Sequence, residues 1–163
     1  MADGVWDRIR IVGIGDDGAE GLSTEARRLL SEADLIIGPK GALELLPESG
    51  AEREVLGSDL ERALERLRSA QAGRVVVLAF GDPLFFGTAR FLIDRLGKDR
   101  FQVVPHVSSM QLGFARVKES WDDALLVNLS QADWRRTVER IRGAEKVGLF
   151  TTDESTPDRI AAR

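Results

Sequence analysis

Short apolar runs alternate along the chain with stretches in which apolar residues recur every three or four positions. Short runs of this kind are typical of strands buried in a sheet, and the wider spacing is typical of helices with one buried face. The run at residues 75–80 is apolar without interruption, as expected of a strand covered on both faces of a parallel sheet. The runs predict strands at residues 9–12, 35–37, 75–80, 101–104, 124–129 and 146–150.

The stretches between these runs predict helices, and most of them begin or end at a residue type that favours a helix boundary. Gly97 and Gly143 follow such stretches and are expected to end the helices there. Serine, threonine and aspartate can cap a helix by accepting a hydrogen bond from a free backbone N–H. The predicted caps are Ser23 or Thr24, Ser58 with Glu61 in a capping box, Ser108 or Ser109, Asp133, and Thr156 before Pro157.

Because predicted strands and helices alternate, we expect an α/β fold with a mostly parallel sheet. Residues 118–123 are polar apart from Trp121 and are the best candidate for a domain boundary, since they lie between a predicted helix and a predicted strand. The boundary separates an N-terminal α/β domain at residues 1–118 from a second α/β domain at residues 124–163. The second domain has only two predicted strands, so we expect it to be truncated or to be completed by a partner chain.

The composition fits a globular protein that does not act in a membrane or on nucleic acid. Apolar residues make up 43% of the chain, which is enough for a sizeable core. The net charge is −4 with both signs interspersed, which argues against broad binding of nucleic acid or of a membrane surface. The absence of cysteine excludes disulfides, thiolate metal ligands and cysteine nucleophiles. The sequence shows neither a long apolar run nor a signal-peptide pattern, so we expect a cytoplasmic protein.

Ligands of α/β proteins bind beyond the carboxyl ends of the strands, and three such ends carry unusual residues in this chain. The first loop, at residues 13–18, spells G-x-G-x-x-G, the dinucleotide-binding pattern. Two features disfavour a dinucleotide: the following helix starts only near Ser23, and Asp16 and Asp17 would face the phosphates. A loop that holds a cationic or neutral ligand fits better, and a simple glycine turn is the alternative.

The second loop follows the run at 75–80 and reads Gly-Asp-Pro-Leu-Phe-Phe-Gly from residue 81. Glycine lets a ligand approach the bare backbone, and proline fixes the turn. The two phenylalanines, Phe85 and Phe86, could form a flat apolar wall for a planar group. The alternative is an ordinary turn whose phenylalanines lie in the core.

The third loop runs from Pro105 to Ser109 and ends in two adjacent serines. Ser108 and Ser109 can cap the following helix, or they can bind a ligand carboxylate together with free backbone N–H groups. His106 is the only histidine, and without a second histidine or a cysteine we expect no metal site there. A serine–histidine–acid triad is also not expected, since the sequence has no G-x-S-x-G elbow.

The order and spacing of these loops resemble the tetrapyrrole methyltransferases, a family of S-adenosylmethionine-dependent enzymes. The resemblance covers nearly the whole chain, from the opening strand and loop through residues 33–38 and the Gly-Asp-Pro loop to the Pro-x-x-Ser-Ser element at 105–109. Within the family, the chain is most similar to members that methylate C-5 of a corrin-ring precursor of the precorrin-6Y and precorrin-7 type. The segments with this closer similarity are residues 18–23, 84–87, 108–112, 114–116, 121–124, 152–153, 156–157 and 160–161.

The resemblance implies a two-domain tetrapyrrole-methylase fold that binds S-adenosylmethionine in the cleft between its domains, usually as a homodimer. The implied cofactor-binding residues are Gly81, Asp82, Pro83, Phe85, Ser108, Ser109 and Leu129. The implied tetrapyrrole-facing residues are Gly13, Gly15, Asp16 and Asp17, and Arg116 is a candidate to pair with the substrate's carboxylates. No residue is assigned as catalytic.

The implied reaction is methyl transfer to C-5 of the corrin macrocycle in cobalamin biosynthesis. In two-part members of the family, C-15 methylation and decarboxylation belong to a separate C-terminal domain, so only the C-5 step is expected of this chain. One alternative is a family member with another substrate, such as uroporphyrinogen, a diphthine precursor or rRNA. The other is a module that binds S-adenosylmethionine and has lost catalysis.

Overall fold

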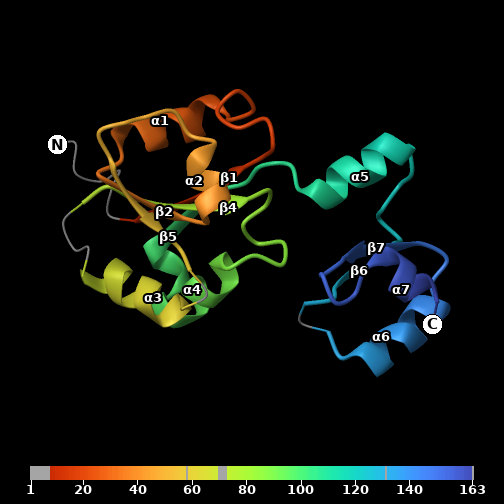
Figure 1. Cartoon of the computed structure of the whole chain (residues 1–163). Coiled ribbons are helices and arrows are strands. Elements are labelled where there is room, and N and C mark those ends of the chain that lie inside the picture. Colours follow the sequence, from red (N-terminus) through yellow and green to blue (C-terminus); the bar gives the residue numbers. More distant parts are fainter. Residues whose placement is uncertain (1–7, 58, 70–72, 131, 163) are drawn as a thin grey trace. The chain divides into compact units, whose positions relative to one another are not determined.

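The computed structural model describes residues 8–57, 59–69, 73–130 and 132–162 (Figure 1). The chain divides into two compact units, and the division falls between Ser108 and Ser109. Each unit is an arrangement of strands and helices in its own right.

The first unit is built on a sheet of five parallel strands in the order β3-β2-β4-β1-β5. This confirms the predicted mostly parallel α/β sheet. The apolar strands β4 and β1 lie at its centre, and the partly exposed β3 lies at one edge. The strands are β1 (Ile9–Ile14), β2 (Leu35–Gly38), β3 (Glu52–Val55), β4 (Val75–Phe80) and β5 (Phe101–Val104).

The sheet is covered by helices on both faces, and each face has its own apolar core (Figure 1). Val12 of β1 packs with the helices of one face, whereas its neighbour Ile11 packs with those of the other, because successive side chains of a strand point to opposite faces. One face holds α1 (Thr24–Glu32) and α2 (Lys40–Glu44), and the other holds α3 (Leu60–Ser69) and α4 (Ala89–Leu96). A short 3-10 turn, η1 (Lys98–Arg100), leads into β5.

The two central strands send the chain to opposite faces of the sheet. After β1 the chain leads to α1 on one face, and after β4 it leads to α4 on the other. β1 and β4 are hydrogen-bonded neighbours in register from Arg10 and Val76 to Ile14 and Phe80. Loops that diverge in this way at the carboxyl ends of adjacent strands leave room for a ligand between them.

Besides the short turn η1, two elements of the first unit were not predicted from the sequence. α2 has only five residues, and β3 reads Glu-Arg-Glu-Val, a polar pattern without the apolar run of a buried strand. Arg53 of β3 donates hydrogen bonds to the carbonyl oxygens of Leu43 and Leu46, 3.2 and 3.3 Å away, so the edge strand secures the end of α2. The predicted cap Ser58 lies outside the described residues, and Asp59 accepts the capping bond from the N–H of Arg62 at 3.2 Å.

The second unit contains a parallel pair of strands with three helices. Its elements are α5 (Ser109–Val117), β6 (Leu125–Asn128), α6 (Trp134–Arg142), β7 (Val147–Phe150) and α7 (Pro157–Ala161). Asp133 caps α6 as predicted, since its carboxylate accepts from the N–H of Arg136 at 3.0 Å. Lys146 binds the carboxylate of Asp123 at 3.1 Å and the carbonyl of Ser120 at 2.6 Å, which fixes the loop before β6.

None of the helices in the part of the chain that the structure describes is both long enough and apolar enough to cross a membrane.

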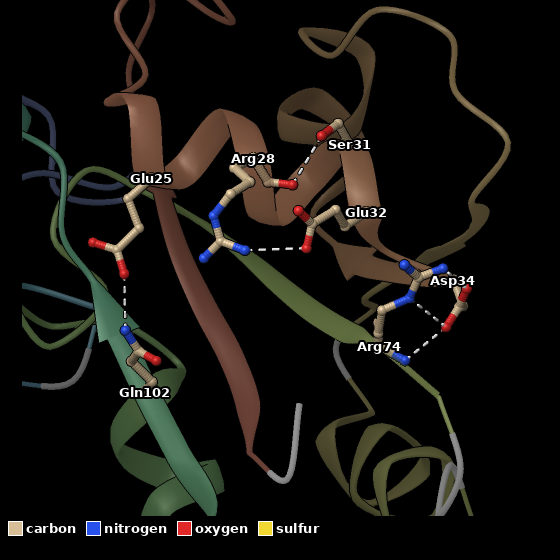
Figure 2. A network of polar contacts seen from close by, with 7 residues as sticks. All are labelled: Glu25, Arg28, Ser31, Glu32, Asp34, Arg74 and Gln102. Atoms are coloured by element: carbon tan, nitrogen blue, oxygen red, sulfur yellow. Dashed lines mark hydrogen bonds and ion pairs between the residues drawn. The ribbon is translucent and has the colours of Figure 1, made fainter. Parts of the chain in front are cut away.

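Polar contacts join the starts of the sheet strands to one another and to α1 (Figure 2). Asp34, just before β2, accepts hydrogen bonds from the backbone N–H and the guanidinium of Arg74, just before β4, at distances from 2.7 to 3.1 Å. The amide of Gln102 on β5 donates to Glu25 of α1 at 2.9 Å. The Arg74 hydrogen bonds lower the pKa of Asp34 from 3.8 to about 2.

We predict that Asp34→Asn reduces the stability of the fold near neutral pH and has a smaller effect in acid. Because the pKa of Asp34 is lower in the folded chain, its charge favours folding above pH 3.8, and this contribution is lost as the pH falls toward 2. Urea unfolding of the variant and the wild type at about pH 6 and about pH 2.5 measures the difference. Asp94→Asn is the matched control, since Arg90 lies 3.7 Å from Asp94 in an exposed pair. The prediction would be contradicted if Asp34→Asn lowered the free energy of unfolding by the same amount at both pH values.

Candidate functional site

The three loops singled out in the sequence meet at one edge of the first unit's sheet. They follow β4, β1 and β5, which are adjacent strands in that order. The N–H of Gly81 donates to the carbonyl of Ile14 at 2.8 Å, and the N–H of His106 donates to the carbonyl of Gly81 at 3.3 Å. Backbone hydrogen bonds therefore tie the second loop to both of the others.

Glycine is required where the backbones approach one another. A Cβ at Gly13 would collide with the carbonyl oxygen of Gly81 and would lie 2.6 Å from the nitrogen of His106. Gly81 has a φ of 60°, which favours glycine, and a Cβ there would lie 2.9 Å from the Cα of Ser108. The glycines that stood out in the sequence of these loops are therefore explained by the close packing of three strand ends.

The second loop is a tight turn that presents apolar side chains to the solvent. The carboxylate of Asp82 accepts from the N–H of Leu84 at 2.9 Å, and the N–H of Phe85 donates to the carbonyl of Asp82 at 3.0 Å. Pro83 is buried, whereas Leu84 and Phe86 are 56% and 41% exposed. Phe86 lies outside the core, and its ring is 4.7 Å from that of Phe85, so the loop does offer an aromatic surface.

Phe86 has a left-handed backbone conformation, with a φ of 55°. Bulky residues rarely adopt this conformation, which costs about 1–3 kcal/mol and persists only where the surroundings impose it. Gly87 packs its Cα directly against the backbone of Pro83, which closes the loop behind Phe86. The strain lies in the segment that carries the exposed aromatic rings.

The opening loop after β1 does not have the geometry of a dinucleotide site. Gly18, the third glycine of the G-x-G-x-x-G pattern, is in a turn with a φ of 59° and donates to the carbonyl of Gly15 at 3.0 Å. The helix starts later, at Thr24, where Ser23 accepts from the N–H of Ala26 at 3.1 Å. A dinucleotide fingerprint needs this glycine at the start of the helix. The structure therefore supports the expectation that the opening loop does not bind a dinucleotide.

The three loops carry carboxylates but no lysine or arginine, so they form a negatively charged rim around the strand ends. Residues 13–23, 81–88 and 105–108 include four carboxylates, at Asp16, Asp17, Glu20 and Asp82, and no lysine or arginine. Asp16, Asp17 and Glu20 are exposed, and Asp82 is partly buried. Such a rim attracts cations and repels phosphates.

The structure brings most of the predicted site residues together and assigns three of them to the other unit. Gly13, Gly15, Asp16, Asp17, Gly81, Asp82, Pro83, Phe85 and Ser108 all belong to the three loops of the first unit or to the strand ends that bear them. Ser108 is buried, with 5% of its surface exposed. The three residues of the second unit are Ser109, the first residue of α5, exposed Arg116 near the end of α5, and half-buried Leu129 after β6.

Sequence reasoning gave no role to His106, which contacts both other loops. Its ring nitrogen Nε2 lies 3.1 Å from the carbonyl oxygen of Gly21, and its backbone N–H binds Gly81. The available signal was that the only histidine of the chain lies two residues after a strand end. In the described ranges, no cluster of three or more histidine, aspartate or glutamate residues could hold a metal ion.

Comparison with known proteins shows that almost the whole chain matches one protein family. Residues 8–158 match the model of the Tetrapyrrole (Corrin/Porphyrin) Methylases. The precorrin-6Y C(5,15)-methyltransferase [decarboxylating] of a Sinorhizobium species is 32% identical over 94% of this chain and 37% of its own length. The cobalt-precorrin-7 C(5)-methyltransferase of Salmonella typhimurium is 29% identical over 94% of this chain and 75% of its own. The chain thus spans little more than a third of the first relative.

Solved structures share the fold at lower identity. The precorrin-6Y methylase of Archaeoglobus fulgidus, described as a cobalamin biosynthesis protein, aligns with a TM-score of 0.71 at 22% identity, over 96% of this chain and 80% of its own. The methyltransferase CobJ aligns with a TM-score of 0.76 at 21% identity, over 95% of this chain and 72% of its own. The α/β fold is therefore the one that these methylases have.

We predict that Gly13→Ala destabilises the first unit by about 1–3 kcal/mol or more, since the new methyl group would meet backbone atoms that cannot move aside. Denaturant unfolding measures the loss. Gly57→Ala is the control, because a Cβ at Gly57 has open space around it and is expected to change stability by no more than about 1 kcal/mol. Equal stability of the two variants would show that the strand ends are not packed as described.

Proposed function

Because the chain belongs to the tetrapyrrole (corrin/porphyrin) methylase family, we propose that it binds S-adenosylmethionine and methylates C-5 of a corrin-ring precursor in cobalamin biosynthesis. The names of the relatives support this substrate, since they act on precorrin-6Y and on cobalt-precorrin-7. The observation that carries the proposal is the meeting of three loops with bare backbone and a negative rim at the carboxyl edge of the sheet.

The loops fit the chemistry of S-adenosylmethionine. The cofactor carries a positively charged sulfonium, which the carboxylates at the loops favour, whereas the phosphates of a dinucleotide would be repelled. The turn that begins at Gly81 carries Phe85 and Phe86, and their rings supply an apolar surface for a flat base. The proposed cofactor-binding residues are Gly81, Asp82, Pro83, Phe85, Ser108 and Ser109, with Leu129 from the second unit.

The opening loop is the proposed contact for the tetrapyrrole. Gly13 and Gly15 allow the loop to pack closely on Gly81 and His106, and the carboxylates of Asp16 and Asp17 are exposed and can stabilise a positive charge. The substrate carries several carboxylates, and Arg116 is an exposed cation that can pair with one of them. Neither aspartate is assigned as a base.

Positioning is the main contribution that this site has to make. The sulfonium of the cofactor supplies an already activated methyl group, and the enamine-like carbon of the macrocycle is already nucleophilic. Holding the two in line can supply several kcal/mol, up to about 7–11 in ideal cases. Backbone atoms fixed by close glycine packing suit this task, because they do not need to reorganise.

The proposal covers the C-5 step alone and places the protein in the cytoplasm as a homodimer. The relatives named for both C-5 and C-15 are much longer than this chain, which spans 37% of one of them. The name of the Sinorhizobium relative also includes position 15 and decarboxylation, and a separate domain with that activity is the proposed partner. The aligned C-5 methyltransferase of Salmonella typhimurium is closer in length, with 75% of it covered.

We predict that S-adenosylhomocysteine binds the purified chain and that Asp82→Ala weakens its binding at least about tenfold, or about 1.4 kcal/mol. Isothermal titration calorimetry measures the affinity. Asp82→Asn is the matched control, since its amide oxygen can still accept the bond from Leu84 that shapes the turn. If only the alanine variant loses affinity, Asp82 shapes the loop; if both do, its charge contacts the ligand. Wild-type affinity in Asp82→Ala would remove Asp82 from the site.

A second prediction concerns the substrate. With S-adenosylmethionine labelled on its methyl group, we expect the chain to label a precorrin-6Y or precorrin-7 type substrate and not uroporphyrinogen. Arg116→Ala should raise KM for the tetrapyrrole by roughly three- to tenfold, because a charge-assisted contact is lost. If uroporphyrinogen alone were labelled, the proposed precorrin substrate would be wrong. Binding of S-adenosylhomocysteine without any methyl transfer would favour a cofactor-binding module.

A further inference from the structure

His106 belongs to the third loop and reaches the opening loop with its ring, and hydrogen-bond acceptors lie at both of its ring nitrogens. Nε2 is 3.1 Å from the carbonyl oxygen of Gly21 and 3.6 Å from a carboxylate oxygen of Asp17. Nδ1 is 3.3 Å from the carbonyl oxygen of Val107. The side chain is 13% exposed.

The opening loop is packed directly on the ring. A Cβ at Gly15 would lie 2.6 Å from Cε1 of His106, so the bare Cα of this glycine lets the loop rest against the edge of the imidazole. A Cβ at Gly21 would collide with the carboxylate of Asp17, which lies over the same turn. Gly15, Asp17 and Gly21 thus hold the ring from one side, and Val107 holds it from the other.

The partners of the ring accept hydrogen bonds and cannot donate them. A carbonyl or carboxylate oxygen needs a donor, and neutral imidazole has a proton on only one of its two nitrogens. With that proton on Nε2, the ring donates to the carbonyl of Gly21 in the opening loop. Of the ionisable groups on the adjoining loops, which are Asp16, Asp17, Glu20 and Asp82, only Asp17 has an oxygen within 4.0 Å of a ring nitrogen in the described part of the chain.

We infer that His106 is a positioning residue, whose ring fastens the opening loop to the third loop. The inference rests on the proposed function, in which the opening loop faces the tetrapyrrole and the loop at Gly81 binds the cofactor. His106 joins them, since its ring binds the opening loop and its backbone N–H binds Gly81. The side chain then helps to hold the substrate-facing residues beside the cofactor loop.

Hydrogen exchange of the amides at residues 15–22 tests the link, measured by mass spectrometry on the whole chain at one pH. We expect these amides to exchange roughly three- to tenfold faster in His106→Ala than in the wild type, because the hydrogen bond to Gly21 and the packing on Gly15 are lost. His106→Gln keeps a donor near the position of Nε2 but loses the ring, so its exchange should be faster by only about twofold.

The glutamine variant keeps the test valid if the alanine variant does not fold. α3 serves as the internal reference, since its exchange should be the same in all variants. Wild-type protection of residues 15–22 in His106→Ala, or in His106→Gln where the alanine variant does not fold, would overturn the inference. So would a loss of protection in α3 as large as that in the loop, because the whole fold would then have been weakened.

Kinetics separate the positioning role from the proposed function. In His106→Ala we expect KM for the tetrapyrrole to rise roughly three- to tenfold, with the affinity for S-adenosylhomocysteine within about twofold of the wild type. An unchanged KM would overturn the positioning role while methyl transfer still stands. If the wild type binds no S-adenosylhomocysteine, the proposed function fails and the positioning role with it, whereas the exchange measurement still reports the loop link.

Discussion

The close approach of three strand ends at glycine is the constraint on which the rest of the structure depends. β4, β1 and β5 can end side by side because Gly13 lets the carbonyl of Gly81 reach its Cα, and because Gly81 adopts a left-handed conformation against Ser108. Any side chain at these positions would push the loops apart. The loops therefore meet at the edge where α/β proteins bind ligands.

The topology turns this packing into a site. Because β1 leads to a helix on one face and β4 leads to a helix on the other, their loops diverge and do not cover each other. Each loop adds a different chemistry: exposed carboxylates from the opening loop, aromatic rings from the second and a buried serine from the third. The proposed binding of a sulfonium-bearing nucleoside follows from this combination and from membership of the methylase family.

The sequence predicted the elements with strong local signals. β4, α4 and β5 have the predicted bounds, since an uninterrupted apolar run and the stop at Gly97 leave little choice. It did not predict α2 and β3, because a five-residue helix and a polar edge strand owe their structure to tertiary contacts such as those of Arg53. The role of His106 was also out of reach, since residues 21 and 106 meet only once β1 and β5 pair.

The central claim is that the three loops form one binding site, and hydrogen exchange with and without S-adenosylhomocysteine tests it most directly. The account predicts that the ligand slows exchange in the peptides that contain residues 13–18, 81–87 and 105–109 together, and leaves α3 unchanged. Protection confined to one of these loops, or found only in other parts of the chain while the ligand is bound, would contradict it.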